Sequence, residues 1–247
     1  MTQEQESLIS RMRAVTISRE YGSGGGEIAS RLAARLGWYL IDHEIVVRVA
    51  QELHISVEEA EEYDERGEST VSQILNSMGT IYPTMFTFVN EPVVPDSKMY
   101  REALSRVVNA AVATRHAVIV GRGAQVLLKD WRDVLHVRII APLEKRIVYV
   151  MQREKLDREQ ARSRISLKDH DRMRYLQTEY NQRPDNALLY DLVVNTSILE
   201  LDSAVDLIVL ALARKAGRIA ASTGELGPAA GVPPYPGHPG DFRPPEQ

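Results

Sequence analysis

The sequence contains no cysteine and no long apolar run. The absence of cysteine excludes disulfides, thiolate zinc sites and thiol nucleophiles, and it leaves the redox compartment open. No stretch reaches the roughly 18 uninterrupted apolar residues that a membrane helix needs. The first residues are polar and acidic, whereas a signal peptide begins basic and then becomes apolar. We therefore expect a cytoplasmic protein that does not associate with membranes.

Excess positive charge is also lacking, because the net charge is -4 at pH 7. A globally basic surface for nucleic acid is thus excluded, and we expect no nucleic-acid partner. With 44% hydrophobic residues in a chain of 247, the sequence can bury a full core. This composition excludes a fibrous or wholly disordered protein.

The two ends of the chain differ from its middle. Residues 1–13 form a polar N-terminal extension, and residues 222–247 hold seven of the twelve prolines with little apolar content. We expect a disordered tail rich in proline and glycine at 222–247. The alternative is that the prolines around Tyr235 bind a protein partner with an aromatic groove.

Between these ends, short β-branched runs alternate with helical patterns. The runs occupy residues 14–18, 38–41, 117–121, 134–140 and 191–195, and several are apolar on both faces. Strands of this type belong in a parallel sheet covered by helices on both sides. The sequence therefore predicts an α/β fold whose ligands bind at the carboxyl ends of the strands.

A glycine-rich loop follows the first predicted strand and precedes a helical stripe. It contains Gly22, Ser23, Gly24, Gly25 and Gly26. Closely spaced glycines at such a junction let backbone amides converge on a phosphate, where the helix dipole favours negative charge. A flexible turn is the alternative, but the strand-to-helix context favours phosphate binding.

The loop departs from the standard phosphate-loop pattern GxxxxGK[ST]. The best alignment places Gly25 at the lysine position and Glu27 near the hydroxyl residue. No lysine therefore reaches the β and γ phosphates. Arg19, at the end of the strand, is the nearest substitute cation, because a guanidinium can hold phosphate bidentately.

Charged residues also follow the second and third predicted strands. Asp42 suits magnesium bound through water, because magnesium keeps much of its hydration and prefers carboxylate oxygen. A helix N-cap is an equal alternative for Asp42. Arg48 is expected to face the second nucleotide's phosphate, and Arg122, between Gly121 and Gly123, is a candidate anion contact. For Arg122 the alternative is an ion pair that fixes the loop.

Charge is distributed unevenly along the chain. Residues 52–68 carry eight acids and one base, whereas residues 144–183 carry eleven Lys or Arg and seven Asp or Glu. The basic segment reads as a solvated helix pair stabilised by ion pairs between neighbouring turns. In an enzyme that transfers phosphate, it would form a lid whose arginines close over the transferring group.

Six segments together resemble the cytidylate kinase family, and more closely its cytidylate-kinase-like branch. They are the glycine loop, the WYLID segment at 38–42 with its following arginine, YREAL at 100–104, GRG at 121–123, DHDRMR at 169–174 and NTS at 195–197. The resemblance covers about residues 14–213. It implies a three-layer P-loop NTPase-type fold over 14–215, with a central parallel sheet, an acceptor-binding insertion at about 55–100 and a helical lid at about 152–183.

The resemblance also implies roles for particular residues. ATP phosphates would lie on the glycine loop. The acceptor's phosphate would be held by Arg48, Arg101 and Arg122, and Asp171 would lie near the acceptor sugar or form an ion pair within the lid. Arg172 and Arg174 would close from the lid, and the donor base would be bordered by Asn195, Thr196 and Ser197. In the family a GRD turn helps to recognise the cytosine nucleotide, and its aspartate is replaced here by Gly123.

We therefore predict an ATP- and magnesium-dependent kinase whose acceptor is a nucleoside monophosphate, CMP-like, or a similar small phosphorylated molecule. Catalysis would consist of positioning and charge neutralisation, with Arg19, Asp42, Arg172 and Arg174 as the catalytic candidates. The missing lysine favours an alternative, a nucleotide-binding regulatory or scaffold protein of the same fold. A third hypothesis, a pure interaction module, predicts no nucleotide binding.

Overall fold

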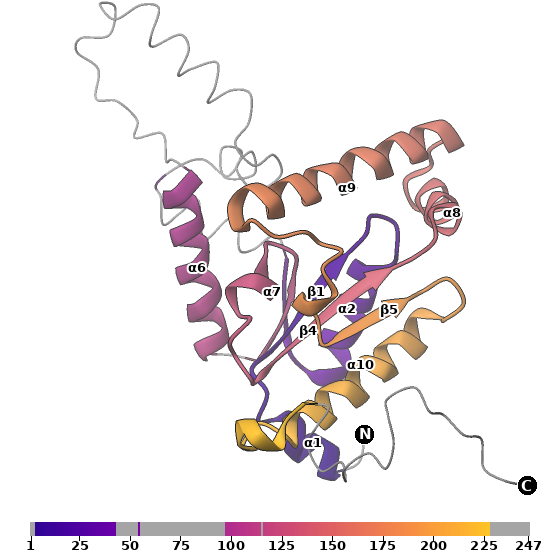
Figure 1. The fold of residues 1–247 in the computed structure, drawn as a ribbon. Helices are drawn as coiled ribbons and strands as arrows, with labels where there is room; N and C mark the ends of the chain where they lie inside the picture. The colour runs from indigo at the N-terminus through magenta and orange to yellow at the C-terminus, as the bar shows by residue number, and fades with distance from the viewer. Residues whose placement is uncertain (1–2, 43–53, 55–96, 115, 228–247) are drawn as a thin grey trace, which may run out of the picture.

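The computed structural model describes residues 3–42, 54, 97–114 and 116–227. Its centre is a five-stranded sheet in which every strand pair is parallel, with the order β2-β3-β1-β4-β5 (Figure 1). The strands are β1 (Ala14–Arg19), β2 (Tyr39–Ile41), β3 (Ala117–Val120), β4 (Val134–Ile140) and β5 (Leu192–Asn195). The predicted α/β fold with a parallel sheet is confirmed.

Helices cover both faces of this sheet and give the molecule three layers. On one face lie α1 (Gln3–Ile9), α2 (Gly25–Leu36) and α10 (Leu201–Ala216), and on the other lie α6 (Ser97–Thr114) and the short α7 (Ala124–Leu127). The predicted lid at about 152–183 contains the end of α8 (Leu143–Glu154) and the whole of α9 (Arg158–Tyr180), and we call α9 the lid helix. Two short 3₁₀ turns, η1 (Ala187–Leu189) and η2 (Thr223–Glu225), complete the described elements.

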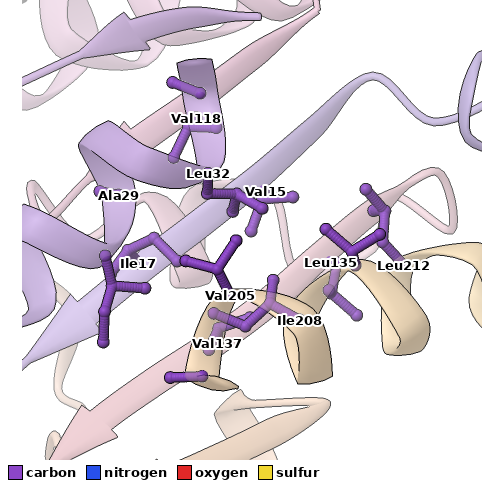
Figure 2. Packing of buried hydrophobic residues seen from close by; sticks show 14 of the residues in the cluster. Val15, Ile17, Ala29, Leu32, Val118, Leu135, Val137, Val205, Ile208 and Leu212 are labelled. Carbon is purple, nitrogen blue, oxygen red and sulfur yellow. The ribbon is translucent and has the colours of Figure 1, made fainter. Parts of the chain in front are cut away.

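The core follows directly from strands that are apolar on both faces. Val15 and Ile17 of β1 pack with α2 and α10, as Figure 2 shows, while Ala14 faces the cluster formed with α6. In the register, Val15 pairs with Val118 of β3 and with Leu135 of β4. Burying both sides of the central strand fixes the position of its carboxyl end, from which the glycine loop departs.

The N-terminal residues are more than the polar extension that we predicted. Residues 3–9 form helix α1, which packs against α10. Ile9 is 4% exposed and Met12 is fully buried, and both belong to the main core. The packing of this segment could not be predicted from the sequence, because its few apolar residues lie among polar neighbours.

At the other end, the fold extends further than the predicted boundary at residue 222. Ser222 donates its backbone N–H to the carboxylate of Glu225 at 2.8 Å and so begins turn η2. The remainder of the predicted tail, residues 228–247, lies outside the described residues. So do Arg48, the acidic segment 52–68 and most of the predicted insertion.

The lid region is helical, as the resemblance implies. Helix α9 begins with a reciprocal capping box, in which Asp157 and Gln160 each bond the other's backbone N–H. It ends at Asn181, which adopts the left-handed conformation common at helix ends. Within the described part of the chain, no helix has the length and apolarity that spanning a membrane requires.

Candidate functional site

Two cavities lie side by side at the carboxyl ends of the strands. The larger, of about 390 Å³, is bordered by the ends of β1 and β3, by β4 and by α9. The smaller, of about 180 Å³, is bordered by the glycine loop and α8. Arg19, Glu20 and Arg172 border both cavities. Parallel α/β sheets bind their ligands at this edge, so the two cavities define the candidate site.

The glycine loop is tightly packed against the protein. A Cβ atom added to Gly22 would lie 2.8 Å from Val150 Cγ2, and one added to Gly25 would lie 2.6 Å from Arg19 Cβ. Gly22 and Gly24 also have positive φ angles of 79° and 82°. By contrast, a Cβ on Gly26 would meet no atom within 4 Å. The packing of the loop thus explains Gly22, Gly24 and Gly25, whereas no atom packs where a side chain on Gly26 would begin, at the border of the smaller cavity.

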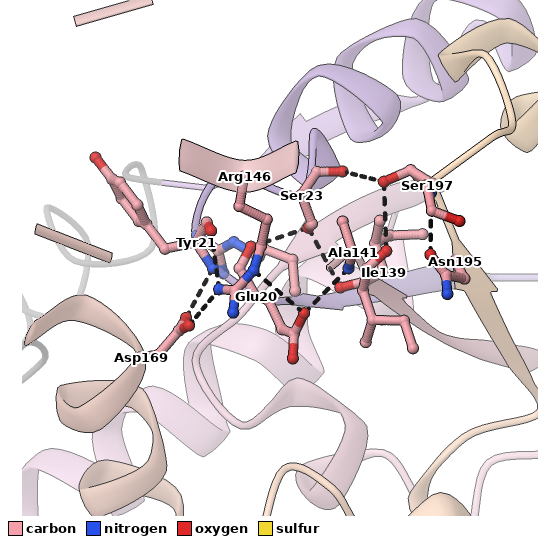
Figure 3. A network of polar contacts seen from close by, with 12 residues as sticks. Glu20, Tyr21, Ser23, Ile139, Ala141, Arg146, Asp169, Asn195 and Ser197 are labelled. Carbon is pink, nitrogen blue, oxygen red and sulfur yellow. Dashed lines mark hydrogen bonds and ion pairs between the residues drawn. The ribbon is translucent and has the colours of Figure 1, made fainter. Parts of the chain in front are cut away.

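Polar contacts hold the loop's backbone in place (Figure 3). Ser23 donates its hydroxyl to Glu20 O at 2.9 Å, and Thr196 donates its hydroxyl to Ser23 O at 2.9 Å. Ser197 donates its backbone N–H to Asn195 Oδ1, which forms a local turn after β5. Of the three residues predicted to border the donor base, Thr196 therefore contacts the glycine loop directly.

The lid is attached to the same loop through Asp169. Its carboxylate accepts a 2.7 Å hydrogen bond from the Tyr21 backbone N–H and a 2.5 Å contact from the Arg146 guanidinium (Figure 3). Arg146 also donates to Tyr21 O at 3.2 Å, and its Nε lies 3.6 Å from the Glu20 carboxylate. None of the predicted site residues is Asp169, Arg146 or Glu20, since contacts over such sequence separations leave no local pattern.

Arg19, the predicted substitute for the lysine, lies at the boundary of the two cavities. Its guanidinium packs against Gly121, where an added Cβ would overlap with it, and its Nη2 lies 3.9 Å from the Asp42 carboxylate. Burial lowers the pKa of Arg19; the charge of Asp42 opposes this shift, and the nearby Arg122 adds to it. The side chain is therefore directed along the sheet edge, beside the glycine loop.

Arg172 of α9 brings a second buried guanidinium to this boundary. It donates to Arg19 O at 3.2 Å and lies over the Tyr21 ring, 5.3 Å from the ring centroid. Burial, together with the positive charge of Arg19, lowers the pKa of Arg172 to about 10. The charge of Arg172 is thus disfavoured by burial and by Arg19, and a bound anion would stabilise it.

The structure brings some of the other predicted residues to the site and places others elsewhere. Arg122 and Asp171 border the larger cavity. Arg101 instead donates to Glu179 O at 2.9 Å and borders neither cavity. Arg174 is exposed on α9 and also borders neither.

The larger cavity contains further polar residues that the sequence did not reveal. Arg138 of β4 donates to Ser18 Oγ at 3.2 Å and lies over the ring of Tyr190. Lys168, Arg183 and Gln125 border the cavity as well. Arg138 lies within a largely apolar strand and belongs to no sequence motif. Only the fold therefore identifies it as a residue of the cavity.

The structure explains the replacement of the family's GRD aspartate by Gly123. This glycine has a φ angle of +66°, and an added Cβ would lie 2.5 Å from Tyr180 Cε2. The Tyr180 ring therefore occupies the space that a side chain at 123 would need. An aspartate at this position would therefore not fit beside Tyr180.

The described residues also indicate where magnesium would fit. They include no group of three or more histidine or acidic residues that could enclose a metal. Magnesium in phosphotransferases is commonly held by one or two carboxylates, by waters and by substrate phosphates. Asp42, whose side chain is 47% exposed beside Arg19, supplies one such carboxylate.

The parallel sheet, the glycine loop at its central strand and the lid over its edge define a phosphate-loop kinase fold. The family model described as "Cytidylate kinase-like family" matches residues 14–198. The chain belongs to this family, and the resemblance inferred from the sequence is confirmed. Membership supports a phosphotransferase of the nucleotide-kinase type.

Three individual proteins are also similar to this chain. A curated protein named uronate isomerase, from Corynebacterium glutamicum, is 32% identical over 120 residues, which cover 49% of this chain and 23% of that protein. The chain thus spans less than a quarter of that relative. An uncharacterised protein of known structure from Eubacterium ventriosum has a TM-score of 0.56 at 20% identity, covering 81% of this chain and 97% of its own. A shikimate kinase from Acinetobacter baumannii, solved with shikimate, scores 0.44 at 14% identity and covers 85% and 98%.

Proposed function

We propose that this protein transfers the γ-phosphoryl group of ATP to a nucleoside monophosphate or a similar small phosphorylated acceptor. One observation carries the proposal. Arg19 and Arg172 border both the cavity at the glycine loop and the larger cavity beside it. A phosphoryl group that passes from a donor in one cavity to an acceptor in the other would meet these two guanidinium groups on its way.

Each part of the site has a role in this reaction. The amides of the glycine loop and the N-terminus of α2 would hold the phosphates of ATP. Arg122, together with Arg138, would hold the acceptor's phosphate in the larger cavity. Arg172 would stabilise the charge on the transferring group, and α9 would exclude water from it. An acceptor phosphate oxygen needs only orientation to attack, so no general base is required.

Magnesium would be held by Asp42 through water and by the phosphates of ATP. When bound, it neutralises negative charge on the β and γ phosphates. The carboxylate of Asp42 also lies near Arg19, so it would help to position this arginine at the boundary.

Steady-state measurement of ATP consumption tests the proposal. The purified protein is assayed with magnesium against a panel of nucleoside monophosphates, and product formation is verified by chromatography. We expect at least one acceptor to raise the rate well above the rate without acceptor. The proposal fails if no acceptor in the panel does so.

A second function, nucleotide binding without efficient turnover, is favoured by a specific observation. The lysine position holds Gly25, and the Tyr21 amide of the loop is already bonded to Asp169. A regulatory or scaffold protein of this kind would bind ATP or a monophosphate in calorimetry while showing no acceptor-dependent ATP consumption. The same two measurements therefore separate the two functions.

A further inference from the structure

The side chain of Gln125 is buried beside the larger cavity without a hydrogen-bonding partner. Gln125 is the second residue of α7, is 3% exposed and borders the cavity. Among the described residues, none forms a hydrogen bond with its side-chain amide. Its amide atoms are not among the fully buried polar atoms that lack a partner, so the amide is open to the cavity that it borders and can form hydrogen bonds there. The cavity's ligand is the natural source of that partner.

Aromatic and apolar side chains of α9 form part of the lining of the larger cavity. Tyr180 packs against Gly123, two residues before Gln125, and meets Tyr175 edge to face with ring centroids 6.0 Å apart. Tyr175 and Leu176 are both buried and border the same cavity. A planar ring can lie against such a wall while its polar edge reaches an amide.

The charged groups border the same cavity and would take the other end of a ligand. Arg19, Arg122 and Arg172 supply positive charge there. A cavity of about 390 Å³ falls in the range of small-molecule sites. The residues that line this cavity thus suit a ligand with an anionic end and a neutral, planar end.

We infer that Gln125 determines which nucleoside monophosphate the protein accepts. Its amide would hydrogen-bond the base of that monophosphate, at an edge where a hydrogen-bond donor lies next to a hydrogen-bond acceptor. This inference rests on the proposed function, because it assigns the base end of the same acceptor. Because Tyr180 fills the space beside Gly123, no side chain at 123 can contact the base, and Gln125 is a polar residue close by on the same segment that borders the cavity.

The chemistry of the amide makes the inference specific. An amide offers one donor group and one acceptor oxygen, so it pairs with the mixed edges of cytosine, uracil and adenine, and with the O6 and N1–H edge of guanine. A carboxylate of the same shape offers acceptors only. It would pair with guanine, which presents two adjacent donors, and would leave the mixed edges mismatched.

Two substitutions test the inference against a matched control. Gln125→Leu removes both hydrogen bonds and is expected to raise KM for the preferred monophosphate about tenfold with little change in kcat. Gln125→Glu is expected to lower kcat/KM for cytosine, uracil and adenine monophosphates about tenfold relative to guanosine monophosphate. The control is Gln177→Leu, an exposed glutamine on α9 that borders neither cavity, and it should match the wild type.

ATP affinity is measured by calorimetry for every variant, and it should stay within about threefold of the wild type. A role that is only structural would change ATP binding or stability without altering the ranking of the bases. The inference is overturned if Gln125→Glu leaves that ranking as it is in an active enzyme. If the wild type neither binds nor phosphorylates any monophosphate, the proposed function fails, and this inference fails with it.

Discussion

The carboxylate of Asp169 on the lid helix accepts a 2.7 Å hydrogen bond from the backbone N–H of Tyr21 in the glycine loop. The same carboxylate contacts Arg146, whose side chain is only 11% exposed and which also donates to Tyr21 O. The lid helix and the glycine loop are thus joined through the backbone of Tyr21. The joint lies beside the smaller cavity, so the position of the lid and the shape of the loop are coupled.

The first prediction concerns the stability of this joint. Asp169→Asn should lower the free energy of unfolding by about 2 kcal/mol, because it leaves the largely buried Arg146 without its nearest counter-charge. Urea denaturation measures the change. Asp171→Asn, two residues along the same helix, is the matched control for stability, since no described residue forms a hydrogen bond or ion pair with Asp171. An equal loss in both variants would show that the joint does not stabilise the fold.

Two neighbouring glycines should respond oppositely to the same substitution. Gly25→Ala should destabilise the protein by about 2 kcal/mol, because its Cβ would lie 2.6 Å from Arg19 Cβ. Gly26→Ala should leave stability unchanged or raise it by up to about 1 kcal/mol, because its Cβ would point into open space within a helix. Thermal denaturation distinguishes the two variants.

Gly26→Ala also tests whether the glycine loop binds phosphate. Because Gly26 borders the smaller cavity, Gly26→Ala should weaken ATP binding about tenfold in calorimetry while the fold stays intact. Unchanged ATP affinity in a stable Gly26→Ala variant would mean that the phosphates do not approach this part of the loop.

Most of the sheet and several of its helices could be predicted from the sequence, because several strands are apolar on both faces and α2, α6 and α10 carry a regular apolar stripe. The glycine loop and Arg122 could be placed at the strand ends for the same reason. The core role of Met12 could not, since a single buried methionine in a polar segment has no periodicity. The contact between Tyr21 and Asp169 joins residues 148 positions apart, and only the packing of α9 onto the loop creates it.

Arg172 should contribute to catalysis through its geometry as well as its charge. Arg172→Lys keeps the positive charge but loses the planar fork, so we expect the rate of phosphoryl transfer to fall about 100-fold with ATP affinity nearly unchanged. Arg162→Lys, an exposed position on the same helix, is the matched control. Equal rates for the two variants in the ATP-consumption assay would remove Arg172 from the catalytic group.

The final prediction concerns His136, which is buried in the middle of β4. Its Nδ1 lies 2.8 Å from the hydroxyl of Thr16, and its exposed fraction is 6%. Burial lowers the pKa of His136 to about 4, Asp191 opposes the shift, and Lys215 adds to it. In the unfolded chain the imidazole takes up a proton near pH 6.5, whereas the folded protein resists protonation until about pH 4.

Between these two pH values the unfolded state binds more protons, so stability must fall as the pH decreases from 6.5 to 4. The loss from this one group is about 3 kcal/mol. His136→Asn removes the titration and should flatten the dependence of the unfolding free energy on pH over this range, even if it lowers the value at pH 7. Urea denaturation at a series of pH values compares the two proteins, and identical slopes for His136→Asn and the wild type would contradict the prediction.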